Sequence, residues 1–157
     1  MMKRVLTLTT LLITAVITFA QNPVHFTSAL KMGKGAEAEI VFTGKIDKGW
    51  HVYSTFHNEK MNGVELVRKL THRGREISQY DNIFGMKLRY FENSVQFVQK
   101  IKFTKPNFKL DCYLEFGACN DEMCMPPTQV ELHKSGKSPA TAEATQPSPE
   151  ELAKQKA

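Results

Sequence analysis

Alternation of apolar and polar residues runs through much of the chain and constrains its fold more than any other feature. Residues at positions i, i+2 and i+4 share one face of a β-strand, so a period of two marks a strand with one buried face. The alternating segments are residues 38–42, 50–54, 95–103, 110–116 and 130–132. No stretch shows a long helical period with capping residues. The pattern therefore predicts half-buried antiparallel strands.

Short polar sequences separate these segments and read as turns. They are Asp47-Lys48-Gly49, Asn62-Gly63, Glu92-Asn93-Ser94 and Pro106-Asn107. Many short strands joined by polar turns predict an all-β chain, folded as an antiparallel β-sandwich. The inner faces supply the large side chains of one core, Trp50, Phe97, Phe103 and Phe116. Val41 alternates with the core positions and is expected on the outer face, beside Glu39.

Residues 1–20 have the pattern of a secretory signal peptide. Lys3 and Arg4 precede an apolar run over residues 5–19, and small residues close the run at Thr18 and Ala20. The alternative is a membrane anchor, but a spanning helix needs roughly 20 mainly apolar residues, and this run is shorter and contains several threonines. We expect cleavage after Ala20 and a periplasmic mature protein.

The remaining chain divides into a domain over residues 21–134 and a flexible tail over residues 135–157. The tail holds three prolines and many Ser, Ala, Thr, Glu and Lys residues. The formal net charge of the whole chain is +5. Its basic residues are scattered, so they do not form the basic stripe that nucleic acid requires.

Cys119 and Cys124 lie between two predicted strands, residues 110–117 and 128–133. Four residues separate them, and four-residue connections are common in β-hairpins. Facing residues of an antiparallel pair have Cα atoms about 4.5–5.5 Å apart, within the roughly 4.4–6.8 Å that a disulfide needs. The two sulfurs can therefore bond in a hairpin. The spacing is not the Cys-x-x-Cys of a thioredoxin-like site, and no helix follows, so a thioredoxin fold is not indicated.

The spacing alone leaves two roles open for this pair, a structural staple and an exchange site. A loop of about six residues contributes only ~2 kcal/mol in the chain-entropy estimate, so the bridge constrains little of the fold. Asp121 and Glu122 disfavour a thiolate and suit a site whose disulfide is attacked by an incoming thiolate. Pro126 and Pro127 lack an N–H and leave part of a strand edge unpaired.

Met123 and Met125 are compatible with a docking surface or with core filling. Cys112 is in phase with the apolar residues of its segment and reads as a buried, inert thiol. The alternative for Cys112 is a bond to another chain or to Cys119. The five histidines show no ligand spacing among themselves. A metal site formed by Cys119, Cys124 and a histidine would make the protein a metal carrier, an alternative that thiolate chemistry allows.

Three segments resemble the N-terminal periplasmic domain of the DsbD thiol:disulfide interchange proteins. The first is Cys-x4-Cys-x-Pro-Pro, formed by Cys119, Cys124, Pro126 and Pro127 after an alternating strand. The others are Gly49-Trp50-His51-Val52-Tyr53, similar to a Gly-aromatic strand that ends in Tyr, and Phe84-Gly85, similar to the aromatic-Gly of the active-site cap loop. The resemblance covers roughly residues 24–134.

The resemblance implies an immunoglobulin-like sandwich with the two cysteines at one end and with Phe84 and Gly85 in a loop that caps them. Tyr53 is a candidate for contact with the sulfurs or, as an aromatic residue of a strand, for packing. It also implies a thiol:disulfide oxidoreductase of the protein-disulfide reductase type, with no cofactor and no metal. Such a domain takes electrons from a membrane-embedded donor and passes them to periplasmic thioredoxin-like or disulfide-containing proteins. We expect a monomer in which Cys124 bonds to the partner and Cys119 resolves the complex.

Two departures from that family stand out. The better-known members space their cysteines by five residues, and they continue into a multi-helix membrane domain and a thioredoxin-like domain. Because this sequence ends at Ala157 with neither, we expect that the donor is a separate protein or that the role has been lost. The alternative functions are an exported binding module with a structural disulfide and the metal carrier.

Overall fold

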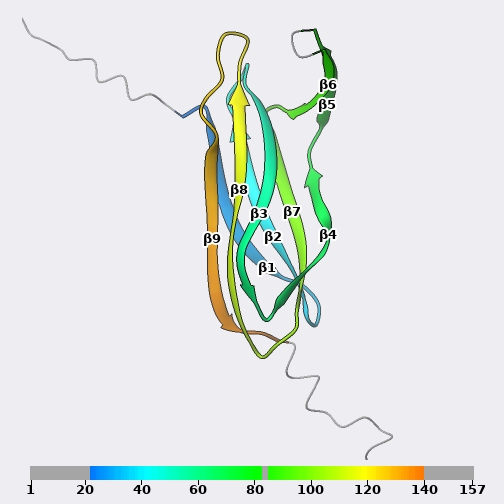
Figure 1. The fold of residues 1–157 in the computed structure, drawn as a ribbon, viewed down its shortest axis with the longest axis vertical. Helices are drawn as coiled ribbons and strands as arrows, with labels where there is room; N and C mark the ends of the chain where they lie inside the picture. Colours follow the sequence, from blue (N-terminus) through cyan, green and yellow to red (C-terminus); the bar gives the residue numbers. More distant parts are fainter. Residues whose placement is uncertain (1–21, 83–84, 140–157) are drawn as a thin grey trace, which may run out of the picture.

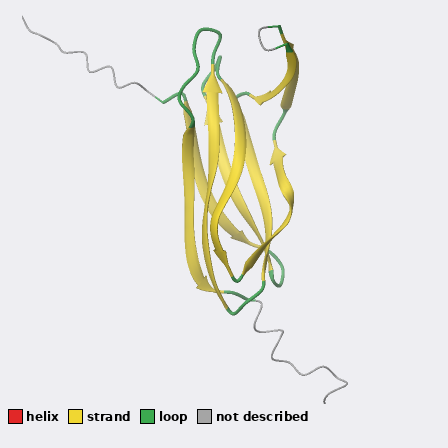
Figure 2. Cartoon of the chain, viewed as in Figure 1, coloured by secondary structure: helices red, strands yellow, loops and turns green. Residues whose placement is uncertain are grey.

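Antiparallel β-strands make up the part of the chain that the structure, a computed structural model, describes: residues 22–82 and 85–139. The strands are β1 (Val24–Met32), β2 (Glu37–Ile46), β3 (His51–Asn62), β4 (Val64–Arg73), β5 (Glu76–Asp81), β6 (Met86–Phe91), β7 (Ser94–Phe103), β8 (Asn107–Cys119) and β9 (Thr128–Lys137). Figure 2 shows no helix in this part of the chain. Accordingly, the described residues contain no helix that could cross a membrane.

The strands form two sheets that pack as a sandwich (Figure 1). One sheet has the order β1-β2-β7-β4, and the other has the order β5-β6-β3-β8-β9. In the immunoglobulin fold, strands A, B, E and D form one sheet and strands C, F and G form the other. The strands β1-β2-β7-β4 and β3-β8-β9 follow those two orders. The β5–β6 hairpin is an insertion between the D and E equivalents, placed at the edge of β3. The all-β, immunoglobulin-like fold predicted above is therefore confirmed.

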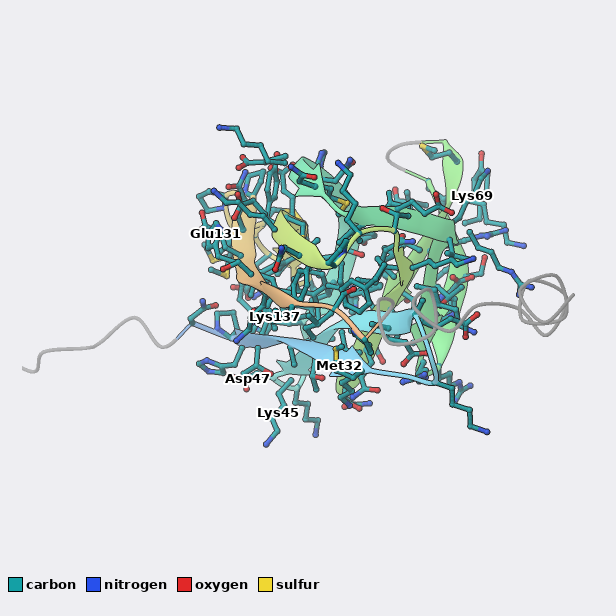
Figure 3. All side chains as sticks on the ribbon, turned by 90° about the horizontal axis from the view of Figure 1, so that it is seen from below. Met32, Lys45, Asp47, Lys69, Glu131 and Lys137 are labelled. Atoms are coloured by element: carbon teal, nitrogen blue, oxygen red, sulfur yellow. A yellow bond between two sulfur atoms is a disulfide. The ribbon has the colours of Figure 1, made fainter. Side chains whose placement is uncertain are left out.

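The core lies between the two sheets, where alternation had placed it. Phe97, Phe103 and Phe116 are buried, and Trp50, just ahead of β3, is half-buried against the same cluster. Each predicted turn joins two consecutive strands. In the view along the long axis (Figure 3), the charged side chains of Lys45, Lys69 and Glu131 lie at the periphery.

Val41 departs from the predicted pattern, because it is on the outer face yet only 1% exposed. Arg73 on β4 and Glu39 on β2 form an ion pair with 3.0 Å between Nη2 and Oε2. Because β7 lies between β2 and β4, this pair reaches across the outer face of the sheet. The predicted outer-face placement of Val41 is correct, and only its burial there differs from a strand with one buried face. Long charged side chains can cover apolar side chains on the outer face of a strand. A period-two pattern alone would predict that this face is exposed to solvent.

Gln99 is a polar residue on the core face of β7 and is only 2% exposed. Its side-chain nitrogen donates hydrogen bonds to the carbonyl oxygens of Arg68 and Lys100, both at 2.9 Å. β4 is irregular between Val67 and Thr71, where Arg68 has a φ of +65°. This irregularity turns a β4 carbonyl toward the amide, so that a buried polar group keeps its hydrogen bonds.

The last strand runs beyond the expected domain boundary at residue 134. β9 continues to Lys137, and Ser138 is held by a hydrogen bond from its Oγ to the carbonyl oxygen of Lys105 at 2.7 Å. Residues 135–137 are thus part of the sheet rather than of a tail. The expected signal peptide and the expected tail beyond residue 139 lie outside the described residues.

Candidate functional site

The two cysteines form a disulfide at the end of the β8–β9 hairpin. Cys119 is the last residue of β8, and an isolated antiparallel bridge pairs it with Cys124. The N–H of Asn120 donates to the carbonyl oxygen of Met123 at 2.8 Å, and the N–H of Met125 donates to that of Ala118 at 2.7 Å. The cysteines are therefore a non-hydrogen-bonded pair, the type in which facing Cα atoms approach most closely. Their Cα atoms are 4.0 Å apart.

Asn120 shapes the turn between the cysteines. Its Oδ1 accepts hydrogen bonds from the backbone N–H of Glu122 at 2.9 Å and of Met123 at 2.7 Å. An Asn side chain can in this way replace a backbone acceptor and close a tight turn. The turn keeps both sulfurs at one end of the sandwich.

The two cysteines differ in exposure. Cys124 is exposed, whereas Cys119 is half-buried. Three residues close to Cys124 in the sequence are also exposed: Met123, at 58%, Pro126 and Pro127. Met125 instead packs against the core cluster. Of the two methionines, Met123 is thus available to a partner and Met125 is core filling.

A hollow of about 640 Å³ lies beside the disulfide, between the hairpin end and β5–β6. Figure 1 shows the β5–β6 hairpin and the β8–β9 loop at the same end of the molecule. The residues lining the hollow are His51, Tyr53, Gln79, Tyr80, Asp81, Asn82, Leu88, Tyr90, Asn120, Asp121, Glu122, Met123 and both cysteines. The site therefore combines strands from the sandwich with the inserted hairpin.

Tyr90 on β6 joins that hairpin to the sandwich. Its ring stacks on His51 with centroids 4.3 Å apart and lies 6.1 Å from the ring of Tyr53. Its hydroxyl donates to Oε1 of Gln79 at 3.0 Å. Only 8% of Tyr90 is exposed, so the ring forms a fixed wall of the hollow.

His51 lies between the disulfide and a carboxylate. It is the direct cross-strand partner of Cys119 in the β3–β8 pair. Its Nε2 is 2.8 Å from Oε1 of Glu92, which follows β6.

The charged groups in the hollow are mainly acidic. Asp81, Asp121 and Glu122 line it. Burial, with smaller contributions from Tyr90 and Asp81, raises the pKa of Tyr53 above its usual value. The phenol of Tyr53 thus keeps its proton at neutral pH and can donate a hydrogen bond. A carboxylate near a sulfur disfavours the thiolate form, because the two negative charges repel each other.

Cys112 lies in the core and is 1% exposed. Burial, followed by the charge of Asp111, raises the pKa of its thiol to about 12. Cys112 and Cys119 are seven residues apart on one strand and point to opposite faces, which rules out a bond between them in this fold. The expectation of an inert thiol agrees with this placement.

Tyr53 lines the same hollow as the two cysteines. Gly85, with a φ of +63°, lies close to Tyr80 on the rim. Phe84 lies outside the described residues. Among the described residues, no group of three or more His, Cys, Asp and Glu side chains is placed to hold a metal ion.

Sequence reasoning missed His51, Tyr90 and Glu92 as members of the site. His51 stood within a segment that resembled the family, and its alternation with Val52 gave its face. Glu92 was read only as a turn residue. No local signal links it to His51, because the two residues meet only through the pairing of β3 with β6.

Comparison with known proteins gives one family. The family model described as "Thiol:disulfide interchange protein DsbD, N-terminal" matches residues 20–136. No curated protein matches the chain.

Several solved structures are similar to the chain. The reduced DsbD N-terminal domain of Neisseria meningitidis is 19% identical, with 72% of this chain and 86% of that chain covered and a TM-score of 0.48. The N-terminal periplasmic domain of ScsB from Proteus mirabilis is 12% identical, with 87% and 52% covered and a TM-score of 0.47. This chain thus spans about half of that domain. The yeast GGA1 GAE domain is 8% identical, with 72% and 92% covered and a TM-score of 0.41.

The family match spans most of the 157 residues and includes β1 to β8, β9 up to residue 136, and both bonded cysteines. The chain therefore belongs to the family of N-terminal domains of the thiol:disulfide interchange protein DsbD.

Proposed function

We propose that this protein exchanges electrons at the Cys119–Cys124 pair in the periplasm. It accepts them from a separate membrane-embedded dithiol donor and passes them to periplasmic disulfide partners, including thioredoxin-like proteins. Family membership supports the reaction class.

The observation that carries the proposal is an exposed disulfide cysteine beside a hollow. Cys124 is exposed, and the disulfide borders a space of about 640 Å³. Attack on a disulfide requires that a thiolate reach one sulfur. A bridge between residues only five apart adds little to stability, ~2 kcal/mol in the chain-entropy estimate. Accessibility therefore favours exchange over a staple.

The reaction follows from this arrangement. A donor thiolate attacks Sγ of Cys124, the Cys119–Cys124 bond breaks, and Cys119 leaves as a thiolate that takes up a proton. The second donor thiolate then attacks the donor sulfur bonded to Cys124 and releases Cys124. The donor dithiol becomes a disulfide, and the pair gains two electrons and two protons. The same steps in reverse reduce a partner disulfide.

The reduction potential tests this proposal. The protein is equilibrated in glutathione or dithiothreitol buffers that differ in the ratio of reduced to oxidised form. Its free thiols are then alkylated and counted by mass spectrometry. We expect a potential above about −300 mV, in the range of exchange proteins. The Cys112→Ala variant, which removes the buried thiol, should give the same value. A potential well below −300 mV would identify a structural staple and a non-catalytic binding module.

Phe84 is proposed to cover the oxidised pair. This rests on the resemblance of Phe84-Gly85 to the cap loop and on the preceding residues Asp81 and Asn82, which line the hollow. An aromatic ring over the sulfurs would block small thiols until a docked partner displaced it. Phe84→Ala should then speed reduction by glutathione several-fold. Tyr80→Ala, which removes an exposed rim ring, is the matched control, and an equal gain in both variants would argue against a specific cap.

A further inference from the structure

His51 and Cys119 face each other at the ends of β3 and β8 that border the site. They are direct cross-strand partners, and both line the hollow. Direct partners of an antiparallel pair project from the same face, with Cα atoms about 4.5–5.5 Å apart. The imidazole and the half-buried sulfur therefore share one face of the sheet.

Two contacts hold the imidazole in place. Nε2 is 2.8 Å from Oε1 of Glu92, and the ring stacks on Tyr90 with an interplanar angle of 26°. Nδ1 has no hydrogen-bond partner among the described residues. A nucleophile beside a base that a third group orients is the arrangement that activates thiols in covalent catalysis.

We propose that His51 carries the proton of the Cys119 thiol and that Glu92 is its positioning residue. This inference rests on the proposed function, and it explains how the half-buried Cys119 of that site loses its proton. A histidine suits the task because it gains and loses protons near neutral pH.

Other ionisable groups line the hollow with His51 or contact it. They are Tyr53 on β3, Tyr80 and Asp81 on β5, Tyr90 on β6, Glu92 after β6, and Asp121 and Glu122 in the hairpin turn. The carboxylates disfavour a thiolate at Cys119. Of the groups around the site, His51 is the direct cross-strand partner of Cys119 and is held by Glu92, so it is the base placed to take the proton.

The proton step fits the exchange chemistry. When Cys124 has attacked a partner disulfide, it is bonded to one partner sulfur and the other partner sulfur has left as a thiolate. His51 takes the proton of Cys119, and the Cys119 thiolate attacks Sγ of Cys124. The Cys119–Cys124 bond forms, the bond from Cys124 to the partner breaks, and the second partner thiolate leaves. The pair loses two electrons, and the partner gains them.

Stopped-flow reaction of the reduced protein with 5,5′-dithiobis(2-nitrobenzoate) separates the two steps. The first thiolate released reports attack by Cys124, and the second reports resolution by Cys119. We expect His51→Phe, which retains a ring against Tyr90, to slow the second phase about tenfold at pH 7, a modest general-base effect. The first phase should change less than twofold.

The pH profile provides a readout that a packing role would not change. In His51→Phe the rate of the second phase should rise with pH toward the pKa of an ordinary thiol, about 8.5, and should approach the wild-type rate there. Glu92→Gln should give an intermediate rate and profile. His57→Phe is the matched control, because His57 also stacks on a tyrosine of β8, with centroids 4.9 Å apart, but does not line the hollow.

Equal second phases in wild type, His51→Phe and the second substitution His51→Gln would overturn the inference. The reduction potential is measured on the same proteins. A wild-type potential above about −300 mV with unchanged second phases rejects only the role of His51. A potential well below that value rejects the proposed function itself, and the inference with it.

Discussion

Cys119→Ser should accumulate a covalent complex with a partner protein in the periplasm, and Cys124→Ser should not. The reason is that Cys124 is the exposed sulfur of the pair, while Cys119 is half-buried beside His51. Exchange passes through a mixed disulfide, which the second thiol of the pair normally resolves. Removal of that second thiol leaves the complex with no internal route to break down. The expected difference between the two variants is therefore nearly all or none.

The complex is detected after acid quenching and thiol blocking, on a non-reducing gel followed by mass analysis. The mass of the released protein should also place its first residue near Gln21, as cleavage after Ala20 predicts. The double variant Cys119→Ser/Cys124→Ser is the control for bonds made by Cys112, which should form none because that thiol is buried and its pKa is about 12.

Two other outcomes would assign different roles to Cys119 and Cys124. A complex formed only by Cys124→Ser would reverse the roles of the two sulfurs. Folded variants that both fail to trap a partner would count against exchange and in favour of a structural bridge.

The sequence was sufficient to predict the strands that have one buried face. β8 alternates strictly from Leu110 to Ala118, and β7 alternates in burial except at Val98, which is buried on the outer face. The cysteine pair begins at the end of β8, at a spacing that suits a hairpin. Period two is produced by burial on one side, so these strands were predictable. β7 was predictable even at Gln99, where a polar residue occupies an inner position.

The inserted hairpin could not be predicted in the same way. β5 has no fully buried residue, and in β6 only Tyr90 and Phe91 are buried. A hairpin with so little buried surface imposes no period on its sequence. The hairpin supplies six of the fourteen residues that line the hollow, so the sequence indicated the sulfur chemistry of the site but not this wall. The pairing of His51 with Glu92 was hidden for the same reason.

The hairpin has little backbone attachment to the sandwich. Its pairing with β3 consists of one register pair, Val52 with Phe91. Side chains at the end of β6 must therefore supply most of the attachment. Phe91 packs edge-on against Phe97 in the core at 5.3 Å, and Tyr90 stacks on His51 on the outer face. These two adjacent rings therefore attach the hairpin to the sandwich through both faces of its sheet.

Tyr90→Ala should lower the free energy of unfolding by about 3 kcal/mol, at the low end for removal of a buried aromatic ring because one side of Tyr90 faces the hollow. Tyr90→Phe is the matched control. It keeps the ring and loses only the hydrogen bond to Gln79, which should cost about 1 kcal/mol. Urea unfolding followed by the fluorescence of Trp50, the single tryptophan, gives both values.

Hydrogen exchange then shows where the stability is lost. In Tyr90→Ala the amides shared by β5 and β6 should exchange faster than those between β2 and β7, because the hairpin loses an anchor while the central pairing of the other sheet keeps its contacts. Equal free energies for Tyr90→Ala and Tyr90→Phe would mean that the ring does not hold the hairpin. A loss in Tyr90→Ala that is confined to the hairpin would instead show that one aromatic residue fixes the wall of the hollow, and with it the positions of His51 and Glu92 beside Cys119.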